Sequence, residues 1–545
     1  MAEAAALIRR LGSLKSQREP LERIYRDCML FVDPYRADGW QGSAMTGEQA
    51  QQQQALLTDS TGPDSYRMLA ASVKQGVTPS NSRWFGMEVG HDTDEERQWL
   101  DLSAETLWEN IHNSNYDAES FEAALDLVGA GWFVMLIDED AERGGLVFTS
   151  YPLSECYVAS SRADGRPDTL YRSFRISAEQ AVNDYGAEAV SEQVRKLAAD
   201  RPDELVEFLQ AIYPRSGLNH RQDKRLAKNL SFASCHVECA TQRTVRESGF
   251  HECPFIAPRW KRIQANSAYG IGPIAVALPD IKTLNMLVRY ELDAAALATS
   301  GMWIAEDDGV LNPRTVKVGP KKVIVANSVD SMKPLMTGAD FNVTFSIKGD
   351  LQRSIRKVMM SDQLEPKDGP AMTATEVHVR VNLIRQLLGP VYGRLQAEWL
   401  QPMIERCFGL AFRAGVFTPP PESLQNRDYF VTYVSPMARA QKLEDVSAMD
   451  RYEVSLANSA ASLAQIDPQR AIAILDNYDF DVAARKRAEL LGVPQDAVPT
   501  SKIIAKVRQL REQATQAAQQ QAVLQQAATS AADAAGKKMG ETAAA

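Results

Sequence analysis

Residues 347–370, IKGDLQRSIRKVMMSDQLEPKDGP, decide the fold, because an amphipathic helix runs here into a segment that cannot extend it. Four apolar residues recur at the three- and four-residue spacing of one helix face: Ile347, Leu351, Ile355 and Val358. The segment that follows contains two prolines and a glycine, all of which disfavour helix. The spacing predicts a helix that contains these four residues and is broken at Glu365–Pro370.

A second helix is expected upstream, over residues 273–300. Its apolar stripe consists of Ile281, Leu284, Leu287, Val288, Leu292 and Ala295, and it ends near Ser300-Gly301. Short alternating runs between the two helices, at 302–304, 316–318 and 323–325, predict a small β element. Two helices that bracket a β element form a stalk with a knob at its tip.

A longer helix is expected beyond the loop. Thr373 and Glu376 have the spacing of a capping box, and an apolar stripe continues from Val377 to Phe408. Unbroken, such a helix would extend roughly 65 Å, although Gly389-Pro390 and Pro402 should kink it. From Pro436 onward the chain is predicted to be helical. Alanine and glutamine dominate 513–535, a segment too poor in large apolar residues to order without packing against other copies.

The first half of the chain alternates helix and strand signals. A helix should end at Asp33-Pro34 and another should begin at Pro63, whereas the glutamines of 51–54 are expected in a surface loop. Residues 132–137 and 146–151 read as a hairpin. Together these patterns predict a helix-rich α+β protein.

Composition limits the classes of function. The 545 residues are 45% hydrophobic, which suits a globular protein of roughly three or four domains. No apolar run is long enough to span a membrane, and the charged N-terminus is not expected to be a secretory signal. Six scattered cysteines favour a reducing compartment. The net charge of −10 predicts no strong overall attraction to nucleic acid.

Several segments, in order along the chain, resemble the portal (head-to-tail connector) family of short-tailed bacteriophages. They are residues 59–85 (DSTGPDSYRMLAASVKQGVTPSNSRWF), Arg259-Trp260 leading to 269–273 (YGIGP), 278–285 (LPDIKTLN), 372–377 (MTATEV) and 435–441 (SPMARAQ). None is a catalytic signature. Their shared order over nearly the whole chain makes the resemblance specific.

The resemblance implies a portal fold with wing, stem, clip and a C-terminal helical crown or barrel. Its parts would be the wing (1–272), first stem helix (273–300), clip (301–345), second stem helix (346–362), tunnel loop (363–371), a long wing helix with β return (372–439), and crown helices with the Ala/Gln-rich tail (440–545).

The resemblance also implies a function and partners. The chain would be one subunit of a ring, of twelve copies in the family, through which double-stranded DNA is packaged and ejected at one capsid vertex. The expected partners are the terminase large subunit, the tail adaptor, and the major capsid and scaffolding proteins. The expected location is the virion, with host cytoplasm during assembly, and neither a cofactor nor a membrane is expected.

Two groups of residues are candidates for contact with DNA. The tunnel loop would contribute Gln363, Glu365, Pro366, Lys367, Asp368, Gly369 and Pro370. The second stem helix carries Arg353, Arg356 and Lys357. These basic residues could equally form intersubunit salt bridges or a solvated face.

Catalytic chemistry finds little support. Cys235, His236, Cys239, His251 and Cys253 invite a zinc site. However, Cys235 and Cys239 fall in a predicted strand, where four residues span about 13 Å, so both thiolates could not reach one ion.

The Gly270-Ile-Gly272-Pro273 run follows polar residues rather than a buried strand, so it is better explained as a helix start than as a dinucleotide fingerprint. We predict no enzyme. The alternatives are another structural virion protein, either an internal core or a tail-adaptor subunit, or a zinc-dependent enzyme.

Overall fold

The computed structural model describes most of the chain. The described residues are 4–37, 40, 47–80, 83–88, 94–140, 144–215, 229–264, 266–300, 303–305, 332–334, 341–364, 389, 391–424, 430–433, 436–464, 476–491, 493, 498–499, 503–516, 519 and 521. They divide into two compact units, Met1–Arg83 with Leu107–Val416, and Trp84–Thr106 with Phe417–Ala545. None of the described helices is both long and apolar enough to cross a membrane.

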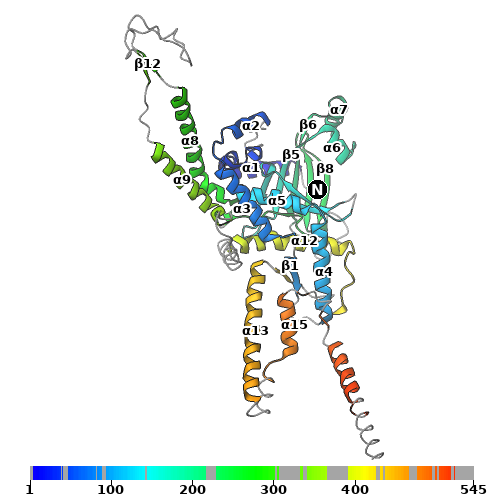
Figure 1. Cartoon of the computed structure of the whole chain (residues 1–545). Helices are drawn as coiled ribbons and strands as arrows, with labels where there is room; N and C mark the ends of the chain where they lie inside the picture. The colour runs from blue at the N-terminus through cyan, green and yellow to red at the C-terminus, as the bar shows by residue number, and fades with distance from the viewer. Residues whose placement is uncertain are drawn as a thin grey trace, which may run out of the picture. The chain divides into compact units, whose positions relative to one another are not determined.

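The first unit begins with three helices (Figure 1). Helix α1 (Ala4–Val32) ends at the predicted Asp33-Pro34 stop, and α3 (Thr61–Val77) contains Pro63 in its first turn. Between them, α2 (Gly47–Ala55) includes the four glutamines that were predicted to form a loop. That prediction was wrong because glutamine is a good helix former, and burial of Ala50 supplies the packing that such a short helix requires.

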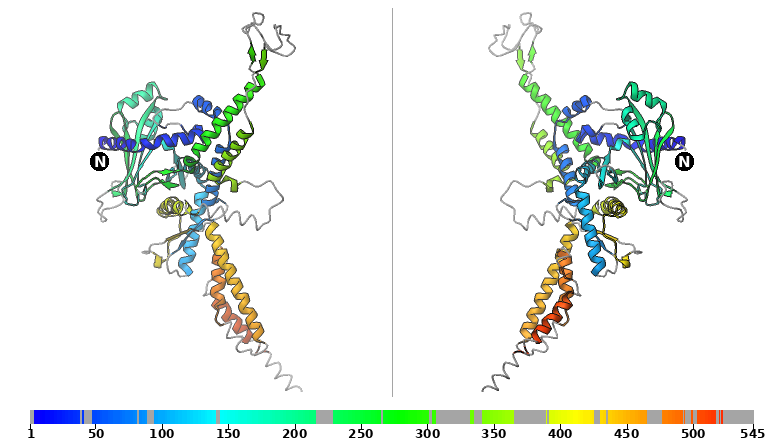
Figure 2. Two further views of the ribbon diagram at one scale, coloured as in Figure 1. Left: turned by 90° about the vertical axis from the view of Figure 1, so that its left-hand side faces the viewer. Right: turned by 90° about the vertical axis from the view of Figure 1, so that its right-hand side faces the viewer.

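The larger sheet is antiparallel. Its order is β4 (Cys156–Ala159), β5 (Thr169–Ser177), β6 (Leu205–Pro214), β7 (Phe232–Glu238) and β8 (Arg243–Phe250). The N-terminal half of α1 packs on one face through Leu7, Leu11 and Leu14. Helices α6 (Ala178–Tyr185) and α7 (Glu192–Asp200) pack against a separate apolar cluster of the sheet, which includes Phe174, Phe208 and Val245 (Figure 2). Ser177 caps α6 by accepting a hydrogen bond from the Gln180 amide.

A smaller sheet contains the predicted hairpin. Strands β2 (Val134–Glu139) and β3 (Leu146–Tyr151) pair antiparallel, and β9 (Phe255–Ile256) adds to β2. Helices α5 (Tyr116–Gly129) and α12 (Gln401–Arg413) pack around this sheet. A five-residue π-helix over Gln396–Leu400 precedes α12. Residues 372–388 of the long helix expected from Met372 lie outside the described part of the chain, whereas residues 391–413 are helical as predicted.

Helices occupy both segments that were predicted to form the stalk. Helix α8 (Pro273–Ser300) and α9 (Phe341–Val358) pack side by side, and β12 (Trp303–Ala305) pairs with β13 (Met332–Pro334) beyond the end of α8 (Figure 1). Helix α10 (Ser361–Leu364) follows α9. The loop predicted from Gln363 therefore begins no earlier than residue 365, because Gln363 and Leu364 are still helical. The predicted strand residues of 316–325 lie outside the described part.

The second unit contains a small sheet and a helical hairpin. Strand β1 (Phe85–Glu88) pairs with β14 (Phe430–Tyr433), and α4 (Asp94–His112) begins in this unit. Helix α13 (Pro436–Ala464) starts at the predicted residue and packs against α15 (Phe480–Leu491). A further helix covers 503–516.

Three glycines allow the chain to cross itself where α8 begins. A Cβ on Gly131 would lie 2.1 Å from the carbonyl carbon of Ile271, and one on Gly270 would lie 2.2 Å from the Gly131 oxygen. A Cβ on Gly272 would lie 2.4 Å from the Val128 oxygen. Gly270 and Gly272 belong to the run that mimics a dinucleotide fingerprint. Their role in the fold is close backbone contact.

Replacing Gly131 by alanine tests this crossing. Gly131 and Gly145 share a positive φ, +91 and +99, but a Cβ on Gly145 meets none of the described atoms within 4 Å. Gly145→Ala should therefore lower the unfolding free energy by only about 1–2 kcal/mol, because alanine disfavours a positive φ. Gly131→Ala should lose about 1–3 kcal/mol more, because the backbone must move. Urea unfolding of both variants measures the difference, and equal losses would contradict a tight crossing.

Candidate functional site

The base of the stalk is held by a buried amide. Asn285 of α8 is 6% exposed, and its Oδ1 accepts from the backbone amides of Thr58 (2.8 Å) and Asp59 (3.2 Å). Asp59 in turn accepts from Gln352 of α9 at 2.8 Å. A buried amide left without these partners would destabilise the fold by about 1–3 kcal/mol. The segment before α3 therefore ties both stalk helices together.

Further polar contacts connect the two helices along their length. Ser354 donates to Asp280 at 2.7 Å, and Lys348 pairs with Glu291 at 3.1 Å. On the other side of α8, Lys282 pairs with Asp27 of α1 at 2.7 Å. These contacts fix which faces of α8 and α9 are buried and which face outward.

The outward face of α8 is apolar. Val276, Met286 and Tyr290 are 67%, 52% and 61% exposed. Together with Pro279 and Thr283 they follow a three- and four-residue spacing, which places them on one stripe opposite the buried Ile281. Contiguous exposed apolar surface is typical of interaction sites.

The outward face of α9 is charged. Arg353 and Lys357, four residues apart, are both exposed, and Arg353 forms an ion pair with Asp350 on the same face. Arg356 projects about a quarter-turn from them and is half-buried. The structure thus exposes two of the three predicted basic stem residues on one stripe and half-buries the third.

The predicted loop residues lie at the end of this helix pair. Gln363 lies within α10. Glu365, Pro366, Lys367, Asp368, Gly369 and Pro370 lie outside the described residues, so their role in the loop stays a prediction.

Two buried arginines, which were not predicted, hold the first unit together. Arg18 of α1 is 1% exposed and donates to the carbonyl oxygens of Leu153, Ser154 and Cys156. Arg259 is equally buried and makes a bidentate pair with Glu398 at 2.8 and 2.9 Å. Arg18 could have been found in the sequence, because it continues the apolar stripe of Leu7, Leu11 and Leu14.

The cysteine and histidine cluster does not converge. Cys235 points toward α1 within the apolar cluster, while its strand neighbour His236 contacts Tyr185 at 2.9 Å on the opposite face of the sheet. Burial lowers the pKa of His236 to about 4, so the ring is neutral at physiological pH. Among the described residues, no group of three potential ligands is placed to hold a metal ion.

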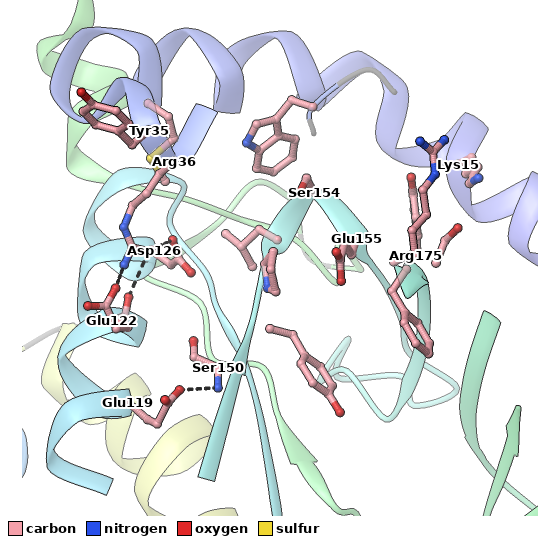
Figure 3. A pocket seen from close by; sticks show the side chains of 18 of the residues that line it. Lys15, Tyr35, Arg36, Glu119, Glu122, Asp126, Ser150, Ser154, Glu155 and Arg175 are labelled. Atoms are coloured by element: carbon pink, nitrogen blue, oxygen red, sulfur yellow. Dashed lines mark hydrogen bonds and ion pairs between the residues drawn. The ribbon is translucent and has the colours of Figure 1, made fainter. Parts of the chain in front are cut away.

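A cleft of about 710 Å³ opens between α1, α5 and the sheets (Figure 3). At one end Arg36 pairs with Asp126 at 2.6 Å and also with Glu122, while Glu119 accepts from the Ser150 amide. Burial raises the pKa of Asp126 to about 6, which outweighs the attraction of Arg36. The polar groups at this end of the cleft bond to one another and fasten both the segment after α1 and strand β3 to α5.

Comparison with known proteins identifies relatives over almost the full length. A family model described as "Bacteriophage head to tail connecting protein" matches residues 4–498. The probable portal protein of Bordetella phage BPP-1 is 28% identical, with 97% of this chain and 95% of that protein covered. The portal protein of Salmonella phage epsilon15 is 26% identical over the same shares.

More distant relatives cover less. The portal protein of Escherichia phage T7 is 22% identical over 56% of this chain and 54% of its own length. A chain from a solved structure, "Neck of empty GTA particle computed with C6 symmetry", is 12% identical. It covers 72% of this chain and 87% of its own length at a TM-score of 0.35.

The titration of Asp126 can be measured through stability. Its folded pKa lies above the unfolded value, so the folded state binds the proton more tightly. The resulting stabilisation is complete below about pH 4 and is lost as the pH rises through 6. Between pH 7.5 and 5, the unfolding free energy of the native chain should rise by about 1–2 kcal/mol relative to Asp126→Asn. A constant difference between the two proteins across this range would contradict the assignment.

Proposed function

This chain belongs to the family of bacteriophage head to tail connecting proteins and is a phage portal protein; from that premise we propose that its copies close into a ring whose channel carries double-stranded DNA. The observation that carries the proposal is the exposed apolar stripe on α8. A stripe formed by Val276, Met286 and Tyr290 would be a liability on an isolated subunit. Contact with a different face of the next copy, repeated around an axis, would bury it in every subunit.

The charged face of α9 supports a separate role for the second stem helix. Arg353 and Lys357 are exposed, and no large apolar side chain lies on their stripe. In a ring closed through α8, this stripe would face the channel, where the two cations attract phosphate. The net charge of −10 keeps the overall attraction to DNA weak, so a duplex can bind without being trapped.

The remaining assignments follow the family pattern. The wing would comprise residues 1–272, and the clip, over 301–345, would dock the terminase large subunit and later the tail adaptor. The loop after α10 would contact the duplex inside the channel, and the crown would comprise 440–545. The ring, of twelve subunits, would contact capsid and scaffolding proteins during assembly in the host cytoplasm. It acts by geometry rather than by catalysis.

Charges on the α8 stripe should prevent ring closure. Met286→Glu and Tyr290→Glu together would place two carboxylates where the next subunit must bury apolar surface, which is unfavourable without a partner. We expect sedimentation velocity to show monomers or small oligomers in place of rings. The control is Arg353→Gln with Lys357→Gln, which should leave rings intact. Rings of unchanged size in the α8 variant would exclude the stripe as the interface.

The control variant itself tests the channel face. Rings that carry Arg353→Gln and Lys357→Gln should bind short DNA duplexes more weakly, and their affinity should depend less steeply on salt, because fewer counterions are released. Fluorescence anisotropy over a salt series measures both. Arg9→Gln with Arg10→Gln removes the same number of exposed charges from α1 and should change neither quantity. Equal effects of the two variants would mean that α9 does not face the duplex.

A further inference from the structure

An apolar groove lies between the two helices of the α13–α15 hairpin. It has a volume of about 420 Å³ and is lined by Met449 and Tyr452 of α13, Tyr478, and Val482 and Ala483 of α15. Tyr452 and Val482 are each half exposed, so the groove opens to solvent. One acidic and one basic residue, Asp479 and Lys486, complete its wall.

The helix over 503–516, called the terminal helix here, contacts the other side of α15. Arg508 makes a bidentate ion pair with Asp481, with both distances 2.6 Å. On a helix of about 3.6 residues per turn, Ala483 and Lys486 lie on the far side of α15 from Asp481. Within one chain, the terminal helix and the groove therefore occupy opposite sides of α15.

The terminal helix also has an uncovered apolar stripe. Ile503, Val507 and Leu510 are 53%, 42% and 57% exposed, and their spacing places them on one face. Ile504, on the Arg508 side, is half-buried instead. The helix thus uses one face for its own chain and leaves a second, apolar face open. Exposed Lys506 borders that open face.

We propose that the apolar stripe of the terminal helix docks into the α13–α15 groove of the neighbouring copy. Donor and acceptor lie on opposite sides of α15, which is the arrangement that a head-to-tail contact requires to repeat around a ring. Three apolar side chains meet a groove lined mainly by apolar and aromatic side chains. Lys506 supplies a positive charge that suits Asp479 at the groove wall. The inference rests on the proposed ring and adds a second, separate contact between subunits.

Disulfide trapping tests the docking. One preparation carries Val482→Cys, the other carries Val507→Cys, and the two are distinguished by tags and co-assembled. The native cysteines all lie between residues 28 and 407, outside this hairpin, and the unmodified protein gives the background. Mild oxidation should yield a covalent dimer that contains both tags. The double variant should yield a ladder longer than a dimer on a non-reducing gel.

The matched control pairs Val482→Cys with Glu512→Cys, because Glu512 lies on the terminal helix opposite the stripe. At least a fivefold lower cross-link yield is expected from this pair. Cross-links only within single chains, equal yields from the two pairs, or no cross-link in rings seen intact by electron microscopy would each overturn the docking and leave the ring standing. Absence of rings in the unmodified protein would overturn both proposals.

Discussion

The buried side chain of Asn285 is the constraint on which the stalk depends. It binds the backbone of Thr58 and Asp59, and Asp59 binds Gln352, so one polar cluster joins α3's leading segment to both α8 and α9. Because a buried amide demands partners, the relative rotation of the two helices is fixed. That rotation decides which stripes face outward: the apolar one on α8 and the charged one on α9.

Much of this fold could be predicted from sequence because its helices are long and periodic. The apolar stripes around Ile281 and Ile355 correctly predicted the two stalk helices. The strand-like runs on either side of residues 138–145 correctly predicted the hairpin. The prediction of a loop at the glutamines of α2 was wrong because it relied on composition alone. Burial of Ala50 decides that this segment is helical. The crossing at Gly131 and the Arg259–Glu398 pair join residues far apart in the chain, so no local pattern reveals them.

The candidate site likewise contains some residues that the sequence predicted and others that it did not. Arg353 and Lys357 were predicted, and helical spacing is enough to place them together. The α8 stripe was missed because Met286 and Tyr290 look like core residues until the buried face is known. We propose that association buries the two exposed apolar stripes, on α8 and on the terminal helix, which lie in different units of the chain.

We propose that this chain is built to be one member of a closed ring. Electron microscopy of the purified, unmodified protein, viewed along its symmetry axis, tests that claim most directly. The account predicts closed rings in which α8 of each copy meets the next copy and an open channel wide enough for a DNA duplex runs through the centre. A monodisperse monomer at every concentration, or a ring with α8 exposed to solvent, would contradict it.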